Sequence, residues 1–134
     1  MKKQLLFIPA LTLVLALLAA CASAPLPPDI DTMEPSVIIQ RAQERADLND
    51  WKGAEQLYQY CADKYADDIY VKTLCRYEIG FAAYKQGQYE RAKTILSALV
   101  ADYQGPQASE MPPHILKLAK MLLETIDAKT GKSK

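Results

Sequence analysis

The side chains that could carry out acid–base or metal chemistry are few in this chain of 134 residues. His114 is the single histidine, and no cysteine or second histidine lies close to it to complete a zinc ligand set. As a general base it would need a nucleophile and an orienting partner, which the sequence does not offer. Aspartates at 63, 67 and 68 fall around a helix end, where aspartate ordinarily caps the next helix. We therefore expect neither an enzyme nor a metal or cofactor site.

Cys21 has the most specific covalent chemistry in the chain. It follows two lysines and an apolar run over residues 5–20, which is the pattern of a secretory signal peptide. That run is shorter than the roughly 20 residues that a membrane-spanning helix needs. The sequence Leu-Ala-Ala-Cys at its end resembles the lipobox of bacterial lipoproteins, in which the cysteine is acylated and becomes the first mature residue. The alternative is an ordinary secretory peptide with a free cysteine nearby.

The lipoprotein resemblance implies where the mature chain resides. Residues 1–20 would be removed, and Cys21 would carry several acyl chains such as palmitate, which makes anchoring stable. Ala22 rather than an aspartate follows the cysteine, which in Gram-negative lipoproteins implies the periplasmic face of the outer membrane. The alternative is the outer face of the cytoplasmic membrane. Loss of the two signal lysines leaves 14 basic against 16 acidic residues, so nucleic acid is not an expected partner.

The mature chain changes character after residue 35. Residues 21–35 contain four of the prolines and few large apolar residues, which predicts an extended, Pro-rich tether behind the lipidated cysteine. At about 3.1 Å per residue, the tether would hold the folded part roughly 40 Å from the lipid. From Ser36 to Gly105 there is no proline and no alternating apolar pattern, which predicts helices.

Two stretches of this helical region share one apolar pattern, displaced by a constant 38 positions. The matched pairs are Trp51 and Tyr89, Ala54 and Ala92, Tyr58 and Leu96, Cys61 and Leu99, and Tyr65 and Tyr103. The helix that precedes each stretch follows the same offset. A fixed offset over many positions predicts an internal repeat, and each unit is then a helical hairpin.

The second unit resembles a tetratricopeptide repeat, whose usual period is 34 residues. The residues that carry this resemblance are Ile79, Gly80, Tyr84, Gly87, Tyr89, Ala92 and Leu96. The first unit keeps Trp51, Ala54 and Tyr58 of the same pattern.

A last helix is expected where Pro112 and Pro113 precede another apolar stripe, and it resembles the helix that caps a repeat stack. We therefore expect an all-α fold of about five helices over residues 36–128. It would consist of two tetratricopeptide-like hairpins and a C-terminal capping helix, followed by a flexible tail at 129–134.

Cys61 and Cys75 are the two thiols inside the expected domain, and they lie at equal distances from a turn at residues 67–68. Antiparallel helices joined at that turn would place the two thiols at the same height. A disulfide is therefore possible in an oxidising compartment. The alternative is a pair of ordinary buried thiols.

A partner-binding groove is the main functional expectation. In tetratricopeptide arrays the first helix of each unit lines a concave groove for peptides or partner helices, where an aromatic stripe would act as an anchor. The expected groove residues are Gln43, Asp47, Leu74, Tyr77, Phe81, Tyr84 and Lys85. The alternative is that the stripe packs against the capping helix or the first hairpin.

Together these features predict a lipid-anchored periplasmic adaptor or scaffold that binds an envelope protein or peptide, with self-association possible. The resemblance to small envelope-assembly lipoproteins with such repeats implies a setting in outer-membrane assembly or secretion. The alternatives are a carrier of a small apolar ligand or acyl chain and a purely structural lipoprotein. A closed apolar pocket would favour the carrier, and an open groove would favour the adaptor.

Overall fold

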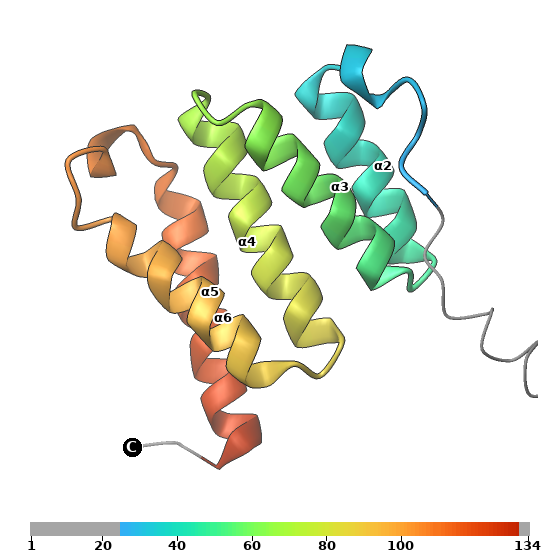
Figure 1. Cartoon of the computed structure of the whole chain (residues 1–134). Coiled ribbons are helices and arrows are strands. Elements are labelled where there is room, and N and C mark those ends of the chain that lie inside the picture. The colour runs from blue at the N-terminus through green and yellow to red at the C-terminus, as the bar shows by residue number, and fades with distance from the viewer. Residues whose placement is uncertain (1–24, 132–134) are drawn as a thin grey trace, which may run out of the picture.

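The computed structural model describes residues 25–131, and over this range the chain is helical without strands (Figure 1). Two single-turn 3-10 helices, η1 (Ile30–Thr32) and η2 (Ala108–Glu110), accompany the α-helices. The α-helices are α2 (Pro35–Asp47), α3 (Trp51–Lys64), α4 (Ile69–Lys85), α5 (Tyr89–Asp102) and α6 (Pro113–Thr130). The expected all-α fold of about five helices is confirmed. The predicted signal peptide and Cys21 lie outside the described residues.

The 38-residue offset reappears in the helix boundaries. Helices α3 and α5 differ by 38 positions at both ends, and α2 and α4 end 38 positions apart. The turn residue that precedes each second helix adopts a left-handed backbone, with φ 61° at Asn49 and φ 73° at Gly87. These two residues are also 38 positions apart, so the two hairpins use the same turn geometry.

Aspartates cap the starts of α3 and α4, and of the aspartates at 63, 67 and 68 it is Asp68 that forms the expected cap. Asp50 accepts a hydrogen bond of 2.9 Å from the backbone N–H of Gly53 at the start of α3. Asp68 accepts one of 3.0 Å from the backbone N–H of Val71 at the start of α4. Each carboxylate satisfies an amide of the first turn that has no partner within the helix.

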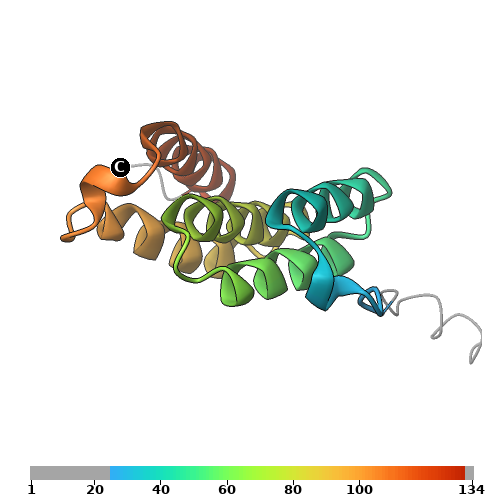
Figure 2. The same cartoon turned by 90° about the horizontal axis from the view of Figure 1, so that it is seen from above.

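The helices form two layers, as Figure 2 shows: α2, α4 and α6 lie in one, and α3 and α5 in the other. Two apolar clusters fill the space between them. The first joins α2, α3 and the first half of α4, and the second joins the end of α4 to α5 and α6. A Cβ on Gly80 would lie 2.8 Å from Leu96 Cδ2, so the glycine permits the close approach of α4 and α5.

The tether predicted over residues 21–35 is wrong for its last part. Ile30 and Met33 are buried in the first cluster, because they cover the end of the α2–α3 hairpin. The Tyr65 hydroxyl donates a 2.5 Å hydrogen bond to the Met33 carbonyl. Further toward the N-terminus, Arg45 donates one of 3.1 Å to the carbonyl of Pro25. The chain is therefore held against the domain ten residues earlier than Pro35.

The predicted tail also begins too early. Helix α6 continues to Thr130 and ends where Gly131 adopts φ 69°. Lys129, expected in the tail, belongs to the helix and places its Nζ 5.1 Å from the centroid of the Tyr84 ring. This contact between α6 and α4 extends the helix beyond the predicted boundary at residue 128.

Candidate functional site

Aromatic side chains of α3, α4 and α5 form one connected cluster, in which Phe81 contacts three of the other rings. Its members are Trp51, Tyr77, Phe81, Tyr84 and Tyr89. Adjacent ring centroids lie 5.8–6.4 Å apart, within the range of favourable aromatic pairs. The stripe predicted on α4 is therefore extended by one aromatic residue from each second helix of the repeat.

The structure divides the expected groove residues into two groups. Leu74, Tyr77, Phe81 and Tyr84 are half-buried and pack against the second apolar cluster, which contains residues of α5 and α6. For these four residues the structure has the packing arrangement that was the alternative to an open groove, and Phe81 also lines the pocket described next. Lys85 is exposed, with its Nζ 5.0 Å from the centroid of the Trp51 ring.

The second group lines a small pocket between α2 and α4, which we call the α2–α4 pocket. It has a volume of about 170 Å³ and is open to solvent. Its lining residues are Gln43, Ala46 and Asp47 of α2, Trp51 and Tyr58 of α3, and Glu78, Phe81 and Ala82 of α4. Three expected groove residues, Gln43, Asp47 and Phe81, thus come together here.

The pocket contains a carboxyl group that is only half exposed. Burial raises the pKa of Glu78 above its ordinary value. The groups that interact with it electrostatically are Tyr58 from α3 and Cys75 and Tyr77 on its own helix. Asp47 of α2 acts on Tyr58 from the opposite wall. All of these groups are neutral or acidic, so they supply no positive charge for Glu78.

Glu78 differs from the other partly buried carboxyl groups among residues 25–131. There are four such groups, and three of them form ion pairs: Asp50 with Arg45, Glu55 with Arg91, and Asp127 with Lys93. No described residue forms an ion pair or hydrogen bond with the side chain of Glu78. The α2–α4 pocket therefore holds the one half-buried carboxyl group of the described chain that lacks a cation.

Tyr58 presents a second unsatisfied group to the pocket. Its side chain is only 2% exposed, and its hydroxyl makes no hydrogen bond within the described residues. Every fully buried side-chain polar atom of the described residues has a hydrogen-bond partner. The Tyr58 hydroxyl has none, so it must retain some accessible surface, and Tyr58 lines the pocket. Burial, followed by the charges of Glu78, Cys75 and Asp47, raises the pKa of Tyr58. The hydroxyl is therefore protonated at neutral pH and free to donate or accept.

Trp51, Tyr58 and Glu78 are not among the groove residues predicted from the sequence. Trp51 and Tyr58 were recognised only as repeat positions of the second helix. Glu78 lies four positions after Leu74 and three before Phe81, so it belongs to the same helical face as the predicted stripe. A charged residue within an otherwise apolar stripe was the signal that could have identified it.

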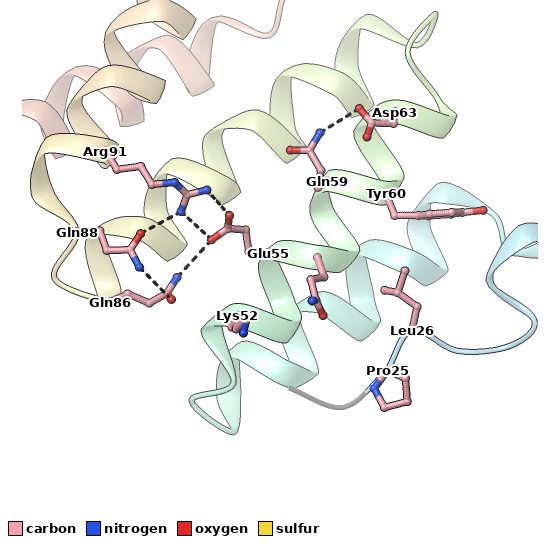
Figure 3. Close-up of a pocket in the computed structure, with 11 residues that line it drawn as sticks. Pro25, Leu26, Lys52, Glu55, Gln59, Tyr60, Asp63, Gln86, Gln88 and Arg91 are labelled. Atoms are coloured by element: carbon pink, nitrogen blue, oxygen red, sulfur yellow. Dashed lines mark hydrogen bonds and ion pairs between the residues drawn. The ribbon is translucent and has the colours of Figure 1, made fainter. Parts of the chain in front are cut away.

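A larger pocket of about 700 Å³ lies beside α3 and α5 on the opposite layer (Figure 3). Pro25 and Leu26 of the N-terminal segment form one of its walls. Arg91 donates hydrogen bonds to both carboxylate oxygens of Glu55, and Gln86 Nε2 donates a third of 3.3 Å. The central carboxyl group of this pocket is therefore already paired, and its network joins the two hairpins.

Cys61 and Cys75 meet inside the first apolar cluster, and both are fully buried free thiols in this structure. A hydrogen bond between the two side chains lowers the pKa of Cys61 and raises that of Cys75. The Cys61 Sγ lies 3.8 Å from the carbonyl oxygen of Pro35. The two thiols thus have the proximity that the symmetrical spacing suggested, while the disulfide itself stays a prediction.

His114 is exposed near the start of α6, with its ring centroid 6.3 Å from that of Tyr70. Across residues 25–131, no group of three or more histidine, cysteine, aspartate or glutamate side chains is placed to hold a metal ion. No helix in this part of the chain combines the length and apolar character that crossing a membrane requires.

Comparisons with known proteins give no functional description. No family model matches the chain, and no solved structure matches it. An uncharacterized protein of Treponema pallidum (strain Nichols) is 26% identical over 110 residues, which cover 81% of this chain and 44% of that protein. The chain thus spans less than half the length of this relative.

Proposed function

We propose that this protein is a lipid-anchored periplasmic adaptor that binds a protein partner of the cell envelope, in outer-membrane assembly or secretion. The observation that carries the proposal is the α2–α4 pocket. It is open, and it combines aromatic walls with polar groups that have no partner within the described residues. A surface with these features resembles the binding groove of helical repeats more than a well-packed apolar core.

The N-terminal contacts bear on how the anchor would hold the domain. The described chain begins only four residues after Cys21, at Pro25. Four extended residues span at most about 14 Å. A lipidated Cys21 would therefore keep the domain close to the bilayer, far nearer than the roughly 40 Å expected from a fully extended tether. An adaptor held this close would meet partners at the membrane surface.

The carrier alternative receives less support. It places a small apolar ligand or acyl chain between the aromatic stripe and the capping helix. That space is occupied, since Leu74, Tyr77 and Tyr84 pack with residues of α6 in the second cluster. The α2–α4 pocket is open and contains carboxyl groups, which do not suit an acyl chain.

Cross-linking in intact envelopes tests the proposal. The lipidated protein, a Cys21→Ser variant and a Gln43→Ala variant are each captured, and bound proteins are identified by mass spectrometry. Gln43 is an exposed wall residue of the pocket, so its truncation leaves the core intact. Met121→Ala, at an exposed position of α6, is the matched control.

Enrichment of one envelope protein that requires both Cys21 and Gln43, but not Met121, supports an anchored adaptor. Recovery of lipids or self-cross-links alone contradicts it. A partner captured equally by the Gln43→Ala variant places the interface elsewhere and removes the support that the pocket gives.

A further inference from the structure

We propose that the α2–α4 pocket binds one basic side chain, a lysine or an arginine, of the partner polypeptide. This inference rests on the proposed adaptor function and specifies the chemistry of the partner. Two carboxyl groups, Asp47 on α2 and Glu78 on α4, line the pocket from opposite helices. Neither is paired with a cation of the described residues.

The burial of Glu78 makes an external cation favourable. A carboxylate removed from water without a partner raises the free energy of the folded chain, and an opposite charge within hydrogen-bonding distance compensates for this cost. The other three half-buried carboxyl groups of the described chain are compensated in this way by internal ion pairs. A basic side chain from a partner would complete the same arrangement for Glu78.

Tyr58 supplies an observation independent of the charges. Its hydroxyl is unpartnered, belongs to a side chain that is 2% exposed, and lines the pocket. A phenolic oxygen accepts hydrogen bonds from an ammonium or guanidinium group as readily as it donates one. The side-chain amide of Gln43 offers a further acceptor on the α2 wall. The pocket therefore has acceptors for several N–H groups.

The aromatic walls suit the rest of a basic side chain. Trp51 and Phe81 meet edge to face, with centroids 6.0 Å apart and an interplanar angle of 78°. Such rings pack against the methylene stem of lysine or arginine and attract its charge. Lys85 already places its ammonium 5.0 Å from the Trp51 ring centroid without lining the pocket. The indole thus accepts a cation within the chain itself.

The size of the pocket suits a single side chain. Its volume of about 170 Å³ is below the roughly 300–1,000 Å³ typical of sites for small-molecule ligands. One extended basic side chain fits this space, while the backbone that carries it would lie across α2 and α4. The assignment to a polypeptide residue follows from the proposed adaptor function, and binding of a free amine is an outcome of the test.

Trp51 provides the assay, because it is the single tryptophan of the chain and lines the pocket. The full chain, purified in detergent, is titrated with blocked five-residue alanine peptides that carry lysine, arginine, norleucine or glutamate at the centre. Free n-butylamine is titrated in parallel. We expect saturable changes in Trp51 emission with the lysine and arginine peptides and none with the other two peptides.

Charge-removing variants test the assignment within the pocket. Glu78→Gln and Asp47→Asn should each weaken binding of the lysine peptide by about tenfold or more. Glu124→Gln, at an exposed position of α6 outside the pocket, removes the same charge and should bind as the unmodified chain does. Thermal unfolding of each variant, measured in parallel, shows that any lost binding does not come from lost folding.

Three results would overturn the inference. They are equal binding of the norleucine peptide, unchanged binding in Glu78→Gln, and binding of n-butylamine as tight as that of the lysine peptide. The outcome is separable from that of the proposed function. Partner capture without peptide binding supports the adaptor function and contradicts the site for a basic side chain. Peptide binding without partner capture supports that site and contradicts the adaptor function.

Discussion

Oxidation of Cys61 and Cys75 should produce a disulfide that stabilises the fold. The two thiols are hydrogen-bonded to each other in the first apolar cluster, on adjacent antiparallel helices. The hydrogen bond lowers the pKa of Cys61, which makes its thiolate the better nucleophile during oxidation. The proposed export would place folding in an oxidising compartment, where such a pair closes.

The size of the effect follows from the loop that the bond would close. About 15 residues lie from Cys61 to Cys75, and closing a loop of this length stabilises a fold by about 3 kcal/mol. For a domain of roughly 100 residues, each kcal/mol corresponds to about 4 °C or more in melting temperature. Reduction should therefore lower the melting temperature by roughly 12 °C or more.

Thermal unfolding with and without dithiothreitol measures this difference in protein isolated from the envelope. The Cys75→Ala variant is the matched control, since it retains Cys61 and cannot form the bond, so its melting temperature should not respond to reductant. The decisive observation is thiol labelling after denaturation without reductant. If both thiols react, the bond is absent, and the contact between them is only a packing contact.

Three further predictions concern folding and charge. Gly80→Ala should lower the free energy of unfolding by about 1–3 kcal/mol, because the added Cβ would lie 2.8 Å from Leu96 Cδ2. An unchanged midpoint of urea unfolding would contradict the close approach of α4 and α5. Asp68→Ala should cost about 1 kcal/mol in the same assay by removing the cap on Val71, and Asp67→Ala, at an exposed turn residue, is its control. Glu78→Gln should raise the melting temperature at pH 7, since burial raises the pKa of Glu78 and its ionised form disfavours the folded state. A carboxyl group with a raised pKa in the folded state contributes stability at pH values below its unfolded pKa of about 4.3, and this stability is lost as the pH rises through its folded pKa. The higher melting temperature of Glu78→Gln should therefore disappear near pH 4. A variant that is less stable than the unmodified chain at both pH values would refute this account.

The repeat made most of the fold predictable. Helical spacing and the constant offset depend on local periodicity, and caps such as Asp50 and Asp68 act within one turn of their own residue. The burial of Ile30 and Met33 could not be predicted in this way. Among prolines and aspartates these two residues show no periodicity, and their burial depends on the exposed end of a hairpin formed later in the chain.

The candidate site was predicted only in part, for a related reason. Helical spacing placed Gln43 and Asp47 on one face of α2 and Phe81 on one face of α4. The structure brings these two faces together at the pocket. The floor of the pocket comes from α3, whose Tyr58 was recognised as a core position of the repeat. Whether a buried repeat position also reaches a pocket depends on the residues of neighbouring helices. A single helical pattern does not contain that information.

The 38-residue offset explains why the first unit's part of the pocket has no equivalent in the second unit. Its polar residues have apolar or basic counterparts in the second unit: Gln43 corresponds to Phe81, Asp47 to Lys85, and Tyr58 to Leu96. In the second unit Leu96 is fully buried and the aromatic residues of α4 pack with α6, so this surface is covered within the chain. In the first unit the same positions keep an acid, an amide and a hydroxyl that no described residue satisfies. We therefore base the proposed external partner on these unsatisfied groups at the uncovered positions.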